Sequence, residues 1–103
     1  MINLQPRYLE MVKKILQKNL TTDVKVFVFG SRATEKVKKF SDLDLALFSP
    51  QKIPFSVFVK LSSDFEESDL PYKVDIIDLK AIDKNFRDKI SKDLKELNFV
   101  KNS

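Results

Sequence analysis

The feature that most constrains this chain is a hydrophobic run that ends at the only glycine in the sequence. Residues 24–29 read Val-Lys-Val-Phe-Val-Phe, and Gly30 and Ser31 follow directly. Ten residues separate Ser31 from Asp42, and one residue separates Asp42 from Asp44, where a second apolar run begins. β-Branched and aromatic residues favour strands, and Gly-Ser favours a tight turn. The pattern therefore predicts two antiparallel strands, with the turn and the aspartates at one end of a sheet.

The turn has the composition of a phosphate-binding corner. Gly30 can adopt backbone angles closed to other residues, and it lets a ligand approach the main chain closely. Ser31 is a favourable helix N-cap, so residues 32–35 are expected to form one helical turn behind it. Free N–H groups at a helix start point toward an anion. We therefore predict that Gly30 and Ser31 bind a phosphate together with Arg32, for which a surface role is the alternative.

Two carboxylates begin the second strand. Alternation along a strand places Asp42 and Asp44 on one face and the leucines around them on the other. Such a pair is costly unless a cation or solvent compensates the two charges. Mg²⁺ prefers oxygen ligands and is commonly held by one or two carboxylates plus substrate phosphates. Asp-x-Asp pairs alone are common, so the spacing from the Gly-Ser corner is what makes this pair a candidate metal site.

A third carboxylate follows from the predicted order of the elements. Residues 54–67 have a helical pattern, and residues 72–79 read as a third strand. The connection is long enough for a helical crossover, which makes this strand parallel to the second. Asp75 is then expected at the same sheet edge as the first two aspartates. Asp78 falls about 10 Å further along, on the opposite face, and is not expected in the site.

Helical patterns flank these strands. Pro6 opens an amphipathic stretch that ends near residue 20, and apolar residues recur at spacings of four and three over residues 82–97. The predicted order is α-β-(turn)-β-α-β-α. This order indicates an α/β fold of the α+β type, with a small mixed sheet of three to four strands covered by helices. The 103 residues suffice for one core, so we expect a single domain over residues 1–103.

The joint motif resembles the signature of a known superfamily. Gly30-Ser31, ten residues and Asp42-x-Asp44 are similar to the motif of the nucleotidyltransferases related to DNA polymerase beta. The resemblance covers roughly residues 24–79. It is closest to the minimal nucleotidyltransferases (MNT proteins), which are single small domains often paired with an all-helical HEPN partner.

The resemblance implies a nucleotidyltransferase enzyme that moves AMP from ATP to a hydroxyl group and releases pyrophosphate. The family has a third acidic residue in the strand equivalent to that of Asp75. Asp42, Asp44 and Asp75 would therefore be the catalytic residues and the ligands of two Mg²⁺ ions, with Asp75 as an alternative proton acceptor. Many relatives continue Gly-Ser-x-Ala with a basic residue and a second glycine, whereas Thr34 and Glu35 follow here.

By the same resemblance, the acceptor is a tyrosine of a HEPN ribonuclease toxin. The chain would then be the antitoxin of a toxin–antitoxin pair, and a HEPN-type helical protein would be its partner. Two alternatives stay open. One is a non-catalytic antitoxin that masks the toxin by contact alone. The other is an enzyme that adenylylates a small molecule such as an aminoglycoside, most simply as a homodimer.

Composition excludes several other classes of protein. The chain has no cysteine and no histidine, which excludes disulfide frameworks, Ser-His-Asp triads and metals held by thiolate or imidazole. The net charge is +4, and Lys36, Lys38 and Lys39 are expected to face either the triphosphate or solvent. There is no membrane-spanning apolar run, signal peptide or nucleic-acid-binding module, so we expect a cytoplasmic protein that binds neither membranes nor nucleic acid directly.

Overall fold

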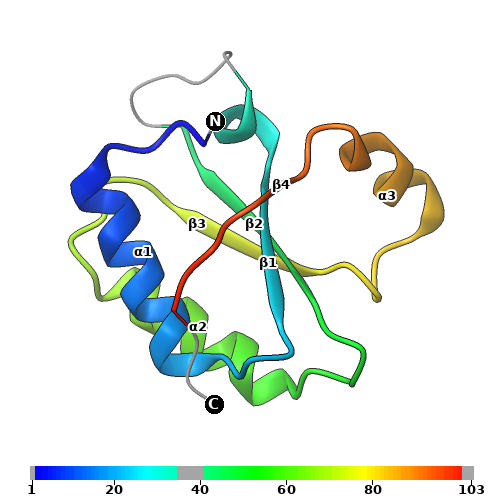
Figure 1. Cartoon of the computed structure of the whole chain (residues 1–103), viewed down its shortest axis with the longest axis horizontal. Coiled ribbons are helices and arrows are strands. Elements are labelled where there is room, and N and C mark those ends of the chain that lie inside the picture. The colour runs from blue at the N-terminus through cyan, green and yellow to red at the C-terminus, as the bar shows by residue number, and fades with distance from the viewer. Residues whose placement is uncertain (1, 35–40, 101–103) are drawn as a thin grey trace.

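A four-stranded mixed sheet forms the centre of the computed structural model, which describes residues 2–34 and 41–100 (Figure 1). The strand order is β3-β2-β1-β4, with β1 antiparallel to both of its neighbours and β3 parallel to β2. The predicted α/β fold with a small mixed sheet is confirmed. Along the chain the elements are α1 (Pro6–Asn19), β1 (Lys25–Phe29), the 3-10 turn η1 (Gly30–Ala33), β2 (Leu43–Phe48), α2 (Phe55–Glu66), β3 (Val74–Asp78), α3 (Lys84–Ser91) and β4 (Lys95–Glu96).

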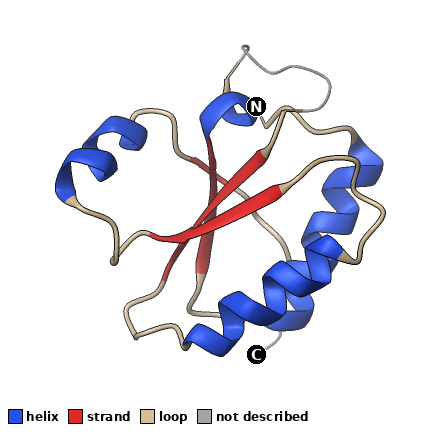
Figure 2. Cartoon of the chain, turned by 180° about the vertical axis from the view of Figure 1, so that it is seen from behind, coloured by secondary structure: helices blue, strands red, loops and turns tan. Residues whose placement is uncertain are grey.

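The two faces of the sheet are covered unequally. α1 and α2 cover one face, and the short helix α3 lies against the other (Figures 1 and 2). Alternation along β2 sends Leu43, Leu45 and Leu47 toward α1 and α2, where each is fully buried. Burying a leucine side chain contributes about 1.5–3 kcal/mol, so β2 anchors the main core. Phe29 and Ala46 belong to a smaller cluster under α3.

α2 forms the crossover between β2 and β3. The helix begins at Phe55, directly after Pro54, and it buries Leu61 and Phe65 in the main core. A crossover of this kind returns the chain to the end of the sheet from which β2 started. β3 therefore runs parallel to β2, as the sequence predicts.

α1 lies beside α2 on the same face of the sheet. It begins at Pro6, whose missing N–H is harmless in the first helical turn. Its buried residues are Val12 and Leu16, and its last residue, Asn19, donates a hydrogen bond to Asp64 Oδ2 of α2 over 2.9 Å. This confirms the amphipathic helix predicted from Pro6. Within residues 2–34 and 41–100, no helix is both long enough and apolar enough to span a membrane.

The segment after β3 differs from the single helix predicted over residues 82–97. α3 begins after Asp83, whose side chain caps it by accepting a hydrogen bond from Phe86 N over 2.8 Å. The helix then ends at Ser91, and β4 pairs antiparallel with β1. Leu97 N extends this pairing by donating a hydrogen bond over 2.8 Å to the carbonyl oxygen of Val26 in β1.

The apolar residues of this segment divide between the two faces of the sheet. Ile90 and Leu94 contact the cluster under α3, whereas Leu97 is 2% exposed in the core under α1 and α2. A single straight helix cannot reach both faces. In addition, β1 without β4 would leave main-chain donors and acceptors unpaired along its outer edge. Strand pairing therefore overrides the helical spacing.

Candidate active site

Three strands bring their functional residues to one corner of the sheet. β1 ends at Phe29, which pairs with Asp44 in the antiparallel register of β1 and β2. Asp44 pairs in turn with Asp75 in the parallel register of β2 and β3. Residues paired across strands project from the same face, so these two carboxylates lie side by side on the face opposite the leucines of β2. Gly30, at the end of β1, adjoins Asp44.

Gly30 lies directly against the carboxylate of Asp44. Its φ of 72° falls in the left-handed region, which other residues rarely adopt. A Cβ atom built at this position would collide with Asp44 Oδ2. Both the backbone conformation and the space therefore require glycine. The unusual backbone angles are those expected from the sequence, and the group that approaches the main chain closely in this structure is the Asp44 side chain.

Asp44 is the carboxylate whose proton affinity is most changed by the site. Burial, and then the nearby carboxylates of Asp75 and Asp42, raise the pKa of Asp44 from 3.8 to about 6. Each of these effects disfavours the charged form of the side chain. Asp75 and Asp42 are therefore each close enough to Asp44 to disfavour its charged form, and a bound cation would relieve that repulsion.

The raised pKa of Asp44 predicts how stability depends on pH. The folded chain binds the carboxyl proton of Asp44 more tightly than the unfolded chain does. Protonated Asp44 therefore contributes stability that is fully present below pH 4 and is lost as the pH rises through about 6. Solvent screens a partly exposed group, so we expect the loss to be about 1 kcal/mol. The measurement is urea unfolding of the wild-type chain and Asp44→Asn at pH 4 and pH 7. An equal difference between the two proteins at both pH values would contradict this prediction.

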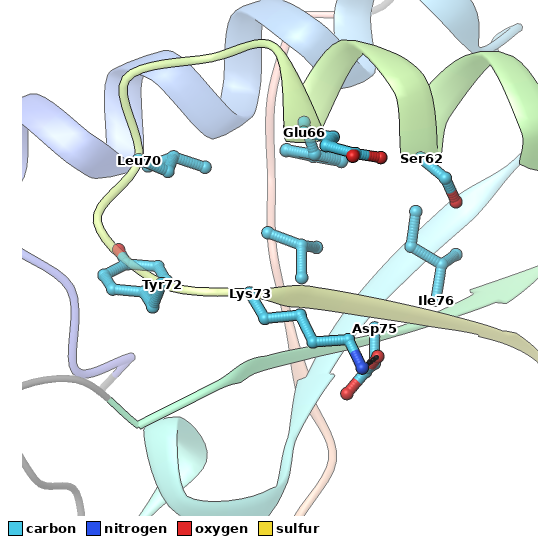
Figure 3. Close-up of a pocket in the computed structure, with 9 residues that line it drawn as sticks. Ser62, Glu66, Leu70, Tyr72, Lys73, Asp75 and Ile76 are labelled. Atoms are coloured by element: carbon cyan, nitrogen blue, oxygen red, sulfur yellow. Dashed lines mark ion pairs between the residues drawn. The ribbon is translucent and has the colours of Figure 1, made fainter.

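Asp42 and Asp75 form the outer part of the carboxylate cluster. Asp42 is exposed and lies one residue before β2 begins. Asp75 Oδ1 lies 3.5 Å from Lys73 Nζ, in an ion pair at the surface (Figure 3). Lys73 is not among the site residues predicted from the sequence. Its position two residues before Asp75 was the available signal, because residues at that spacing share one face of a strand.

The chemistry of this donor set fits a magnesium ion. All three side chains offer carboxylate oxygens, the ligands that Mg²⁺ prefers. In the part of the chain that the structure describes, no three acidic side chains are gathered into a complete metal site as they stand. A cation bound to Asp75 would also have to replace the ammonium group of Lys73. These residues are therefore better suited to bind an ion that is also coordinated by the phosphates of a substrate than to form a complete metal site by themselves.

The helical turn after β1 is present but begins two residues earlier than predicted. It is the 3-10 turn η1, and Ser31 lies inside it, so the prediction that Ser31 caps the turn is wrong. Thr34 closes the turn, because its N–H and its Oγ1 both donate hydrogen bonds to the carbonyl oxygen of Ser31 over 3.1 Å. The other loop residues of interest lie outside the described residues: Glu35, Lys36, Lys38 and Lys39.

Arg32 is buried, and it joins the turn to its surroundings. Its side chain is 6% exposed, and Nε and Nη2 donate hydrogen bonds to the carbonyl oxygen of Ser41 over 3.1 and 2.9 Å. Nη1 donates to the carbonyl oxygen of Asn3 over 3.1 Å, and the guanidinium carbon lies 4.0 Å from the centre of the Tyr72 ring. Neither a phosphate contact nor a surface position matches this geometry. Arg32 holds η1 against the start of β2 and the segment before β3.

Replacing Arg32 with lysine is expected to lower the free energy of unfolding by about 2 kcal/mol. Lysine keeps the charge but cannot form the forked hydrogen bonds or stack on the Tyr72 ring, so it leaves main-chain carbonyls unpaired. Chemical denaturation measures this loss. The control is Arg7→Lys, because Arg7 is exposed and its guanidinium contacts the neighbouring Tyr8, and we expect a change below about 0.5 kcal/mol. Equal losses in the two variants would contradict the structural role of Arg32.

Comparisons with known proteins agree with the corner motif. The sequence matches the family described as "Polymerase beta, Nucleotidyltransferase" over residues 10–99. It is 42% identical over 91 residues to the "Probable protein adenylyltransferase MntA" of Haemophilus influenzae, an alignment that spans 88% of this chain and 79% of that protein.

Solved structures share the fold. A toxin–antitoxin structure with AMP-PNP superposes with a TM-score of 0.71 at 20% identity, over 89% of this chain and 73% of that chain. The complex of a tri-AMPylated Shewanella oneidensis HEPN toxin with its MNT antitoxin gives a TM-score of 0.68 at 19% identity, over 94% of this chain and 74% of that chain. Sequence and fold lead to one conclusion: the chain belongs to the polymerase beta family of nucleotidyltransferase enzymes.

Proposed function

We propose that this chain transfers AMP from ATP to a tyrosine hydroxyl of a HEPN-type helical toxin and thereby acts as its antitoxin. The observation that carries the proposal is the meeting of the Gly30 turn with the paired carboxylates of Asp44 and Asp75. The 42% identity to a probable protein adenylyltransferase supports the reaction type. The structural similarity to an MNT antitoxin bound to an AMPylated HEPN toxin supports the choice of partner.

The acidic residues and the turn have separate tasks in this reaction. The turn formed by Gly30 and Ser31 orients the phosphates of ATP through its main-chain N–H groups. The tyrosine oxygen forms a bond to the α-phosphorus, the bond from that phosphorus to the β-phosphate oxygen breaks, and pyrophosphate leaves. The proton of the hydroxyl passes to a carboxylate, for which we assign Asp75 because it lies at the outer side of the cluster. The products are the AMP-tyrosine ester and pyrophosphate.

We assign Asp42 and Asp44 as the residues that hold Mg²⁺, and metal ligation by Asp75 is the alternative to its role as proton acceptor. Bound there, Mg²⁺ supplies positive charge to the triphosphate and lowers the pKa of the attacking hydroxyl. The raised pKa of Asp44 supports this assignment, because a cation favours the charged form that burial and the neighbouring carboxylates disfavour. We assign the whole reaction to one domain, residues 1–103, acting in the cytoplasm, where ATP is available.

The test is incubation of the chain with α-labelled ATP, Mg²⁺ and its co-purifying helical partner, followed by mass spectrometry of both proteins. We expect the mass of the partner to increase by one or more AMP units, and the increase to map to a tyrosine. The increase should be largely lost in Asp44→Asn. The matched control is Asp78→Asn, which removes a carboxylate from β3, the strand that holds Asp75, at a position paired with Leu47, and which should leave transfer unchanged.

Two other results would replace the proposal. A tight complex with a folded chain but without transfer would indicate an antitoxin that acts by contact alone. Label found on a small molecule such as an aminoglycoside, with none on a protein, would indicate a small-molecule adenylyltransferase, and sedimentation would then show whether a homodimer forms.

A further inference from the structure

A groove runs along the outer edge of the sheet beside the carboxylate cluster. β3 is an edge strand, and the groove, with a volume of about 650 Å³, lies between it and α2 (Figure 3). Phe65 and Glu66 of α2 line one side, and Val74, Asp75 and Ile76 of β3 line the other. Asp75 therefore belongs both to this groove and to the candidate active site.

The main chain of β3 has one hydrogen-bonding edge open. The Lys73 carbonyl oxygen accepts a hydrogen bond from Leu43 N, and Leu79 N donates to the Leu47 carbonyl oxygen, each over 2.9 Å. Alternate residues of a strand turn their main-chain groups to opposite edges, so the odd-numbered residues of β3 pair with β2. The N–H and C=O groups of residues 74 and 76 consequently face outward. Within the described residues, β3 pairs with no strand other than β2.

The side chains beside this open edge alternate between two environments. Val74 and Ile76 pack against the core that contains the buried residues of α2. Lys73 and Asp75 lie on the other side of the strand from Ile76 (Figure 3). A strand added here would follow the same alternation. Every second side chain would enter the groove under α2, and the side chains between them would project on the face of Asp75.

The charge beside the groove limits what can occupy it. Glu66, Asp75 and Lys73 line the groove, and Lys73 forms an ion pair with Asp75. Glu66, Glu67 and Asp69 are all exposed, so acidic groups outnumber the one lysine here, in a protein whose net charge is +4. An occupant with positive charge complements this local acidity. A second copy of the chain would instead bring the same excess of acidic groups to this edge, where like charges repel.

We propose that the open edge of β3 binds an extended, basic segment of the acceptor protein as an added strand. Main-chain hydrogen bonds hold the segment, apolar side chains fill the groove, and the acceptor hydroxyl projects on the face of Asp75. The inference rests on the proposed function for the role of this segment as the acceptor. The binding itself requires neither ATP nor Mg²⁺, so the two can be tested apart.

The probes are blocked peptides of about ten residues in which valine alternates with lysine around one central tyrosine. We expect nuclear magnetic resonance to show shifted signals and slowed hydrogen exchange at the amides of residues 74 and 76. A peptide with glutamate in place of lysine should bind at least about tenfold more weakly. The same loss is expected for a peptide that is N-methylated at the alternate residues whose N–H groups would face β3. Equal binding of the lysine and glutamate peptides, or no shift at these amides, would overturn the proposal.

Variants of Ile76 separate main-chain pairing from side-chain packing. Ile76→Pro removes an outward N–H that β2 does not use, so proline is tolerated there as on other edge strands. Ile76→Ala removes the side chain and keeps the N–H. We expect Ile76→Pro to weaken the lysine peptide at least about tenfold relative to Ile76→Ala. Equal affinities would overturn strand addition, and if Ile76→Pro does not fold, the N-methylated peptide decides the question with the wild-type chain.

Further results distinguish this inference from the proposed function. Asp44→Asn should bind the lysine peptide as the wild-type chain does while losing transfer. Transfer to the partner that is equally fast in Ile76→Pro and Ile76→Ala would overturn the docking site and leave the enzyme intact. A dimer of the wild-type chain that Ile76→Pro converts to a monomer would show that a second copy occupies the edge, and this would also overturn the proposal.

Discussion

Replacing Asp44 with asparagine is expected to lower the rate of AMP transfer by about a hundred- to a thousandfold while making the chain more stable. The rate falls because a group placed to act on developing charge in the transition state is lost. The fold becomes more stable because burial, Asp75 and Asp42 all disfavour the charged carboxylate that asparagine replaces. At pH 7 the gain is about 1 kcal/mol, or roughly 4–8 °C in Tm for a domain of this size.

A substitution that lowers activity while raising stability identifies a carboxylate that serves the reaction rather than the fold. Stability is measured by thermal unfolding without Mg²⁺, and transfer by the mass increase of the partner. The matched control is Asp78→Asn, because Asp78 Oδ1 accepts a hydrogen bond from the main-chain N–H of Lys80 over 2.9 Å that the asparagine oxygen can also accept, so stability should not rise. Lower stability in Asp44→Asn would indicate a structural carboxylate, and unchanged transfer would remove Asp44 from the reaction.

Replacing Gly30 with alanine is expected to impair both the fold and the reaction. The left-handed backbone at φ 72° costs about 1 kcal/mol for a residue with a Cβ. The added methyl group also collides with Asp44 Oδ2, so the carboxylate must move away from the turn. A displacement of that kind is expected to slow transfer by about a hundredfold, because the reacting groups are no longer aligned.

A double-mutant cycle separates the backbone strain from the collision. Asp44→Ala removes the carboxylate that the new methyl group would meet, so Gly30→Ala should cost about 1 kcal/mol less in that background. Urea unfolding of the four proteins gives the coupling free energy. A cost that is the same in both backgrounds would show that strain alone explains the effect and that Gly30 does not shape the position of Asp44.

Features that depend on neighbouring residues could be predicted from the sequence. Pro6 and Pro54 mark where α1 and α2 begin, because proline is tolerated at a helix start and not inside a helix. The spacing of Asp42 and Asp44 fixes their relation through the twofold repeat of a strand. Even the position of Asp75 could be predicted, since a crossover longer than a hairpin makes the third strand parallel.

Features that depend on contacts between distant segments were decided only by the tertiary structure. The helical spacing up to Leu97 gave no sign that β1 needs a partner at its outer edge, and this need turns the segment after α3 into β4. Arg32 looked available to a ligand beside Ser31, yet the carbonyl oxygens of Asn3 and Ser41 enclose it. A local pattern in the sequence indicates which residues share a face of a helix or strand. Only the assembled sheet determines which main-chain groups need a hydrogen-bonding partner from a distant segment.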